Sequence, residues 1–314
     1  MRRVIRNTLL IPNGISGVKL SSKPLTTSRR ALSTPSFDGE MSTLYSIVAE
    51  QHRHEKGPWA KMLVAAKTAL DGRKGDIKLL DLASGAGEPG LTIAKELPKV
   101  KVAITDISPD QVALATERAA GHSNVTTNVV DLVDLSMFED NSFDVVTVCY
   151  GYMFCENKQK AFDETHRVLK PGGVLIATYW KKLQSVEFSQ RVLEEIYRDG
   201  TVPPPSIDPM SLSTDGLCEE FVKTSGFLPC HIITEQSDYP FNLGSDRDMI
   251  YKLGVLPMYP KLQELKERGK MVCLKRGEET FWKEMTTAPN VHIDSVGNYI
   301  VEENVFEMLT AVKK

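Results

Sequence analysis

Short apolar runs alternate with helical patterns in the middle third of the chain. The runs lie at residues 77–81, 101–106, 124–130, 143–151 and 174–180, and nearly continuous apolar runs of this length predict buried strands. Helical patterns occupy residues 89–97, 108–119 and 157–169 between them. Because strands that alternate with helices are typical of βαβ units, the pattern predicts a Rossmann-like α/β fold with a mostly parallel sheet.

The flanking regions are mainly helical in pattern. Residues 42–70 predict two helices that are separated near Gly57 and Pro58. Beyond residue 180, helical patterns lie at 186–198, 214–225, 245–254, 260–271 and 278–285, and strand patterns lie at 228–234 and 299–312. The prolines at 203–205 and at 209 predict a loop or lid.

The first 37 residues contain seven basic side chains, many Ser and Thr residues, and no Asp or Glu. This composition is typical of an organelle transit peptide, and a basic tail that binds an acidic surface is the alternative. We expect a mitochondrial protein, with a plastid or the cytoplasm as alternatives. Without these seven charges the formal net charge falls from −3 to about −10, which argues against a nucleic-acid partner.

Several other classes of protein do not fit the sequence. No run of 18 or more apolar residues occurs, so we expect a soluble protein without stable membrane insertion. The five cysteines form no C-x-x-C pair and the six histidines form no H-E-x-x-H motif, so we predict no metal site. The oligomeric state is not predicted.

A turn of small residues, ASGAG at 83–87, joins the run 77–81 to the helical pattern that begins near residue 89. Strand, tight turn and helix form the unit that cradles a phosphate or nucleoside, because a ligand lies against the main chain where a Cβ would intrude. The second run ends at Asp106, 21 residues after Gly85. At that distance a βαβ unit delivers an acid to the hydroxyls of a ribose.

A nicotinamide-dependent oxidoreductase also fits part of this pattern. Gly85, Gly87 and Gly90 satisfy G-x-G-x-x-G, the fingerprint of dinucleotide binding. In the frame D-x-G-x-G-x-G, however, Ala83 occupies the first glycine place. The dinucleotide alternative therefore stays open.

Five blocks follow one another between about Asp76 and Trp180: LLDLASGAGEPG, ITDISPDQVALA, NVVDLVDL, FDVVTVCYGYMF and HRVLKPGGVLIATYW. In this order they resemble the class I S-adenosylmethionine-dependent methyltransferases, in the branch of the ubiquinone and menaquinone C-methyltransferases. The resemblance implies a seven-stranded, mostly parallel sheet with helices on both faces, closed by an antiparallel pair at 228–234 and 305–312. It also implies a mainly helical insertion or lid before the last strand.

The resemblance implies S-adenosyl-L-methionine as cofactor and S-adenosyl-L-homocysteine as its product. Residues 81–87 would hold the methionine end, Asp106 the ribose, and Asp131 with Leu132 the adenine. Asp134 is an alternative to Asp131 for this role. Asp131 could also serve only to cap the turn that follows it. The candidate donor-binding residues are Asp81, Ala83, Ser84, Gly85, Gly87, Asp106, Ile107, Asp131, Leu132 and Cys149.

The composition of the first 37 residues and the resemblance together predict the domain organisation. We expect residues 1–37 to be the transit peptide and 38–314 a single methyltransferase domain. Within that domain, residues 41–180 would form the donor-binding core, 181–300 the substrate-side helices and insertion, and 301–314 the closing strand.

The acceptor is hidden because a sulfonium already carries an activated methyl group, and no nucleophilic side chain or metal is needed. The candidate catalytic residues are Tyr45, His52, His54, Tyr150 and Tyr152. Core packing would also explain the tyrosines, and a solvated helix face would explain the two histidines. We predict methyl transfer to a small molecule. A quinone ring is one alternative, although residues 151–155 read GYMFC where the quinone enzymes usually read like G-I-R-N-V. A non-catalytic methyltransferase-like module is another.

Overall fold

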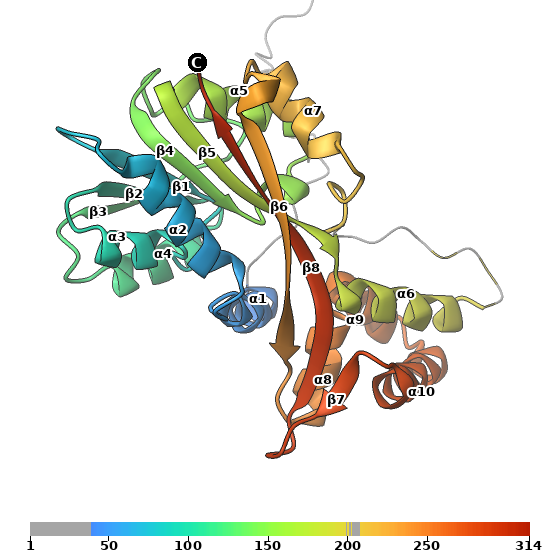
Figure 1. Ribbon diagram of the computed structural model, residues 1–314. Coiled ribbons are helices and arrows are strands. Elements are labelled where there is room, and N and C mark those ends of the chain that lie inside the picture. Colours follow the sequence, from blue (N-terminus) through green and yellow to red (C-terminus); the bar gives the residue numbers. More distant parts are fainter. Residues whose placement is uncertain (1–38, 199, 201, 203–207) are drawn as a thin grey trace, which may run out of the picture. The chain divides into compact units, whose positions relative to one another are not determined.

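The protein consists of a mixed β-sheet with helices packed against it (Figure 1). The computed structural model describes residues 39–314 except 199, 201 and 203–207, so the predicted transit peptide and the prolines at 203–205 lie outside the described residues. The strands are β1 (Lys78–Leu82), β2 (Lys101–Asp106), β3 (Val125–Val129), β4 (Phe143–Cys149), β5 (Leu169–Lys182), β6 (Ile232–Asn242), β7 (Val291–Ile293) and β8 (Tyr299–Val312). They are ordered β3-β2-β1-β4-β5-β8-β6, and β7 pairs with β8.

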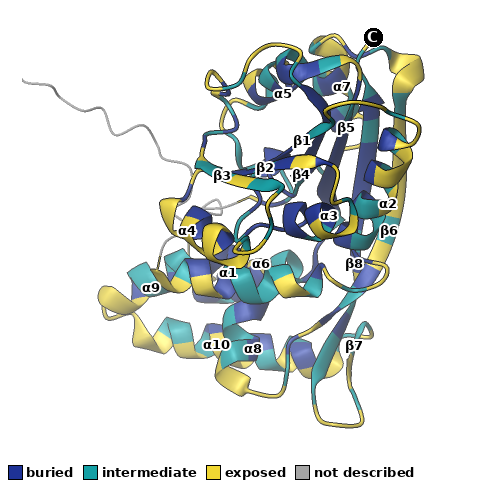
Figure 2. Cartoon of the chain, turned by 90° about the vertical axis from the view of Figure 1, so that its left-hand side faces the viewer, coloured by how far each residue is buried: buried dark blue, intermediate teal, exposed yellow. Residues whose placement is uncertain are grey.

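The first five strands are parallel, as their apolar pattern predicted. Both faces of β1 and β4 are covered, and Leu79, Leu80 and Val146 are completely buried. Figure 2 shows the central strands in the dark blue of buried residues. The predicted Rossmann-like fold is confirmed, and the short eighth strand β7 is an addition to the seven expected.

The helices are α1 (Gly39–Gln51), α2 (Pro58–Leu70), α3 (Gly90–Glu96), α4 (Pro109–Arg118), α5 (Lys158–Val168), α6 (Gln184–Ile196), α7 (Leu217–Thr224), α8 (Arg247–Gly254), α9 (Tyr259–Glu267) and α10 (Met271–Thr287). The sheet grows from β1 toward β3 on one side and from β4 toward β5 on the other. Because crossovers between parallel strands are right-handed, this reversal puts α3 and α4 on the face opposite to α5. Ligands of open α/β sheets bind at such a reversal, which lies here where β1 and β4 end.

The C-terminal part closes the sheet with antiparallel strands. β8 pairs with β5 through residues 305–312 and with β6 along nearly its whole length, so the predicted antiparallel pair is present and longer than expected. Residues 299–304 extend past the end of β5 and pair with β6 and β7 instead. Helices α8, α9 and α10 form the predicted insertion between β6 and β8, and α6 packs against α8 and α10. Among the described residues, no helix is both long enough and apolar enough to cross a bilayer.

Candidate functional site

The carboxyl ends of β1 and β4 lie side by side at the point where the strand order reverses. Leu82 of β1 is in register with Val148 of β4, and both chains then turn away from the sheet. A Cβ placed on Gly151 would lie 2.7 Å from the Cβ of Ala83, so the two turns touch. Open α/β sheets bind their ligands at this place.

The turn after β1 is fixed by its own main chain. The Ser84 amide donates to the Thr105 carbonyl (2.9 Å), and the Ser84 carbonyl accepts from the amides of Gly87 (2.9 Å) and Glu88 (3.1 Å). Ala83, Gly85 and Gly87 all have positive φ. A Cβ on Gly87 would lie 2.7 Å from Leu91, whereas one on Gly85 would come no nearer than 3.5 Å to the Gln111 side chain. Packing within the protein therefore explains Gly87, and Gly85 is the position with room beside it.

The candidate Asp81 is completely buried beneath the turn. Its Oδ1 accepts from the Thr147 hydroxyl (2.5 Å), and its Oδ2 accepts from the Gly90 amide (2.8 Å) at the start of α3. Burial raises the pKa of this carboxyl to about 7, against the effect of those hydrogen bonds. Both oxygens are thus occupied by protein groups, and Asp81 positions the turn from below.

Asp106, at the end of β2, meets the turn after β1. Its Oδ2 accepts from the Gly85 amide (2.8 Å) and its Oδ1 from the Ser108 amide (2.9 Å). Burial raises the pKa of Asp106, although the amides of Ser108 and Gly85 act in the opposite direction. Ile107, the next residue, is 38% exposed and offers an apolar surface at the same edge.

The third candidate segment follows β3. Asp131 accepts from the Val133 amide through Oδ1 (3.1 Å), and its carbonyl accepts from the Asp134 amide (2.9 Å). Asp131 therefore does shape the following turn, which was one of its two predicted roles, while its side chain stays partly exposed. Leu132 is buried, and its side chain lies 3.9 Å from the position that a Cβ on Gly151 would occupy.

Buried aromatic rings continue from the end of β4. Tyr150, whose φ is 58°, stacks on Trp180 with centroids 4.2 Å apart. Its hydroxyl lies 3.2 Å from that of Tyr239 on β6, and the Tyr239 hydroxyl lies 2.7 Å from Nδ1 of His52. Burial lowers the pKa of His52 to about 3 and raises the pKa values of Tyr150 and Tyr239, so all three side chains are neutral near pH 7.

Two further acceptor-side candidates, His54 and Tyr45, and the donor-binding candidate Cys149 lie in different places. His54 stacks on Tyr239 with ring centroids 6.3 Å apart, and Tyr45 is half-buried, with a pKa raised by burial. The Cys149 thiol accepts from the Thr178 hydroxyl (3.6 Å), and burial raises its pKa to about 12.

Tyr152 is turned away from this cluster. Its hydroxyl is 2.7 Å from that of Thr165, and its ring stacks on Phe162 of α5. The structure thus brings His52, His54 and Tyr150 together and leaves Tyr152 in the core.

Helix α1 and the residues just after it close over the turn. The Gln111 amide nitrogen donates to the Ser42 hydroxyl (2.5 Å), which connects α1 to α4 beside Gly85. The Gln51 side chain accepts from the Asn242 amide of β6 (2.8 Å). Arg53 donates to buried Glu88 (3.3 Å). These contacts hold His52 against the aromatic rings.

Sequence reasoning missed Tyr239 and Thr147. Tyr239 is 187 residues from His52, in a region where the recognisable motifs have ended. Thr147 stands inside an apolar run, FDVVTVC, and this polar residue in a buried strand was the signal that a partner had to lie opposite.

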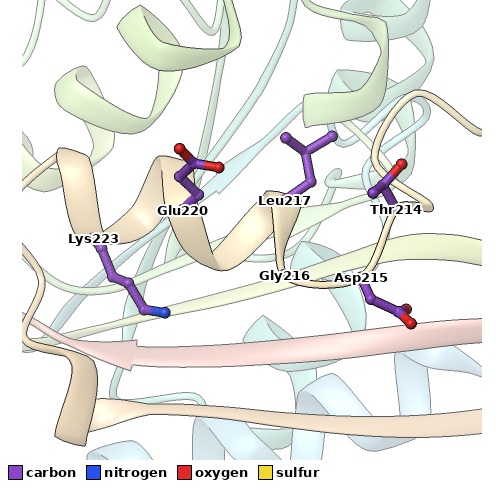
Figure 3. A pocket seen from close by; sticks show the side chains of 6 residues that line it. All are labelled: Thr214, Asp215, Gly216, Leu217, Glu220 and Lys223. Carbon is purple, nitrogen blue, oxygen red and sulfur yellow. The ribbon is translucent and has the colours of Figure 1, made fainter.

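A depression elsewhere on the chain carries none of these groups (Figure 3). It lies at the start of α7 and is lined by Thr214, Asp215, Gly216, Leu217, Glu220 and Lys223. Asp215 pairs there with Lys181 (2.5 Å) and is almost fully exposed. The polar groups converge at the ends of β1 and β4 instead, and we take that edge of the sheet as the candidate site.

The central part of the chain is similar to known methyltransferases. Residues 79–173 match the family model described as a methyltransferase domain. The chain is 35% identical over 115 residues to the ubiquinone/menaquinone biosynthesis C-methyltransferase UbiE of Hydrogenovibrio crunogenus, which is 35% of this chain and 44% of that protein. It is 30% identical over 112 residues to the mitochondrial 2-methoxy-6-polyprenyl-1,4-benzoquinol methylase of Caenorhabditis elegans, 34% of this chain and 39% of that protein. The chain thus spans less than half the length of these two relatives.

Among solved structures, the YcgJ protein of Bacillus subtilis shares the fold. The TM-score is 0.53 at 17% identity, and the superposition covers 83% of this chain and 99% of YcgJ. The match of residues 79–173 to a methyltransferase domain confirms the predicted resemblance for the segment that contains the turn, Asp106 and Tyr150. The cofactor of such a domain is S-adenosylmethionine, as predicted.

Proposed function

We propose that this protein transfers a methyl group from S-adenosylmethionine to a small-molecule acceptor by in-line displacement. One observation carries the proposal: the Gly85 amide donates to Asp106 Oδ2 at 2.8 Å, where the strand order of the sheet reverses. Asp106, the acid that would bind the ribose, thus lies next to a turn with room for a ligand, within residues that match a methyltransferase domain.

The residues present suit the donor. The Asp106 carboxylate accepts from the amides of Gly85 and Ser108 and keeps lone-pair capacity for the ribose hydroxyls. Exposed Ile107 offers an apolar surface for the adenine. Asp131 would accept a hydrogen bond from the adenine amino group. Ser84 and Gly85 would lie along the methionine end. Asp81 acts from below, because its oxygens are already bonded to Thr147 and Gly90.

S-adenosylmethionine supplies a methyl group on a positively charged sulfur, so the protein has to align the acceptor and exclude water. The aromatic rings after β4 serve the second task, since Tyr150 and Trp180 are almost completely buried. Tyr150, Tyr239 and His52 contribute neutral hydrogen-bonding groups and no charge. This favours an uncharged acceptor with a hydroxyl or carbonyl group. The acceptor rings in the names of the quinone relatives belong to this class.

Loss of the Tyr239 hydroxyl is expected to reduce methyl transfer without affecting the donor. In Tyr239→Phe, the hydroxyl between Tyr150 and His52 is missing, so both partners lose a hydrogen bond in a buried site. We expect a fall in rate of about tenfold or more, from a loss of about 1.5 kcal/mol. Label transfer from isotopically labelled donor to a cell-extract metabolite fraction measures the rate. Tyr251→Phe, a change in α8 away from the site, is the matched control. Equal rates for the two variants would remove Tyr239 from the site.

Calorimetry with S-adenosylhomocysteine and with NAD tests the donor. Binding of S-adenosylhomocysteine without NAD supports methyl transfer, and the reverse result would favour the oxidoreductase that the shifted glycine frame allows. The labelled-donor screen then separates an enzyme from a non-catalytic module. A non-catalytic module would bind S-adenosylhomocysteine, but no labelled metabolite would be formed.

The proposal includes delivery to the mitochondrion by residues 1–37. Their seven basic side chains and lack of acidic ones support it, and the name of the C. elegans relative includes the mitochondrion. A fluorescent fusion of residues 1–37 tests it. Plastid or cytoplasmic fluorescence would overturn this part alone.

A further inference from the structure

The connection between α9 and α10 combines positive charge with exposed apolar side chains. We call residues 266–272, Lys-Glu-Arg-Gly-Lys-Met-Val, the α9–α10 tip. Every residue of the tip is exposed, and Figure 2 shows this connection in yellow at the left-hand ends of the two helices. Met271 is 56% exposed and Val272 74%. Of the large apolar side chains that are exposed in the described part of the chain, Met271 and Val272 are the one pair that is adjacent in sequence.

The apolar pair has no packing role in the helix that carries it. α10 buries Gly277, Phe281 and Met285 along one face. Gly277 is where α10 comes close to α6, because a Cβ there would lie 2.8 Å from Ile196. Met271 and Val272 occupy the first turn of α10, ahead of this contact. Two large apolar side chains at the end of a helical hairpin remain available to something outside the chain.

The charge around the pair is strongly positive. Residues 261–276 hold six basic and two acidic side chains, whereas the chain beyond its first 37 residues carries a formal charge of about −10. Arg268 and Lys261 both pair with Glu264. In the part of the chain that the structure describes, no ion pair involves Lys266 or Lys270, which flank the exposed connection.

We propose that the α9–α10 tip rests on an anionic lipid surface. Met271 and Val272 would enter the headgroup region, and Lys266 and Lys270 would contact lipid phosphates. Apolar side chains bordered by lysine are the combination that binds at the interface of an anionic bilayer, because burial and charge attraction act together. The charge favours this occupant over the same tip of a second copy, which is basic as well. The inference is independent of the methyl acceptor.

Co-sedimentation of the full chain with vesicles tests the proposal. The probes are vesicles of phosphatidylcholine alone and of phosphatidylcholine with phosphatidylserine. We expect binding to the anionic vesicles that weakens as salt is added. The double variant Lys266→Glu/Lys270→Glu should weaken binding at least about tenfold. The double variant Met271→Ser/Val272→Ser should weaken binding several-fold, because two apolar side chains no longer enter the headgroup region. Residues 1–37 are identical in all variants, so differences between variants report on the tip.

The matched control is Val296→Ser. Val296 is 76% exposed and lies in the turn between β7 and β8, beside Asp294 rather than beside lysine. It should bind like the unchanged chain, and thermal unfolding should confirm that all variants are folded. Equal binding by all variants would overturn the proposal. A loss in the charge variant without one in Met271→Ser/Val272→Ser would also overturn it, because the tip would then be an electrostatic surface for any polyanion.

Discussion

Asp106→Ala is expected to weaken the binding of S-adenosylhomocysteine by about 1–3 kcal/mol, or about 5- to 150-fold. The ribose would lose charged hydrogen-bond acceptors. The Gly85 and Ser108 amides would also lose theirs, so the turn would be less well fixed. Calorimetric titration of both proteins measures the difference.

Two further variants separate these causes. Asp110→Ala removes an exposed acid in the first turn of α4 and should leave affinity unchanged. Asp106→Asn keeps one acceptor oxygen for the turn but removes the charge, and it should lie between the aspartate and alanine proteins. Unchanged affinity in Asp106→Ala would show that the ribose binds elsewhere and would remove the observation that carries the proposed function.

The parallel half of the fold was predictable because its signals are local. A strand that is covered on both faces must be apolar throughout, so β1, β2, β4 and β5 appear as apolar runs. Their carboxyl ends share one edge of the sheet, so residues that follow them were expected to meet. The contact between Gly85 and Asp106, 21 residues apart, is the clearest case.

The acceptor side was not predictable to the same depth. The backbone after β4 decides whether Tyr150 or Tyr152 lies on the side of the candidate site. Tyr150 has positive φ there, and Tyr152 begins a short 3-10 helix. No sequence pattern indicates that bend. Tyr239 reaches the site because β6 and β8 pair over residues 232–242, and that register is set by contacts far apart in the chain.

The roles of the glycines in the turn after β1 could not be predicted from the sequence either. Spacing alone suggested that the glycines make room for a ligand. At Gly87 and Gly90, however, a Cβ would meet Leu91 and the Asp81 carboxylate, both at 2.7 Å. Close packing at Gly90 is also what the third glycine of the dinucleotide fingerprint requires, so Gly90 does not separate the two readings. Gly87 does, because Leu91 occupies the space that the second glycine of the fingerprint would leave for a pyrophosphate, which weakens the frame as an argument for NAD.

Asp81 is expected to make the stability of the protein depend on pH near neutrality. Its carboxyl is completely buried, and burial raises its pKa from 3.8 to about 7. A carboxyl with a raised pKa stabilises the folded state fully below its unfolded pKa, and this contribution is lost as the pH rises through 7. A shift of about three units corresponds to about 4 kcal/mol. Compared with Asp81→Asn, the unchanged protein should therefore lose up to that amount of unfolding free energy between pH 4 and pH 8.

Urea unfolding of both proteins at several pH values measures this effect, because groups that titrate in both proteins cancel in the difference. The asparagine can accept from Gly90 and donate to Thr147, so its fold should be kept. A difference that stays constant from pH 4 to pH 8 would contradict the expectation. In that case the hydrogen bonds from Thr147 and Gly90 would be enough to hold a charged Asp81, and the turn beneath the donor would rest on a buried carboxylate throughout.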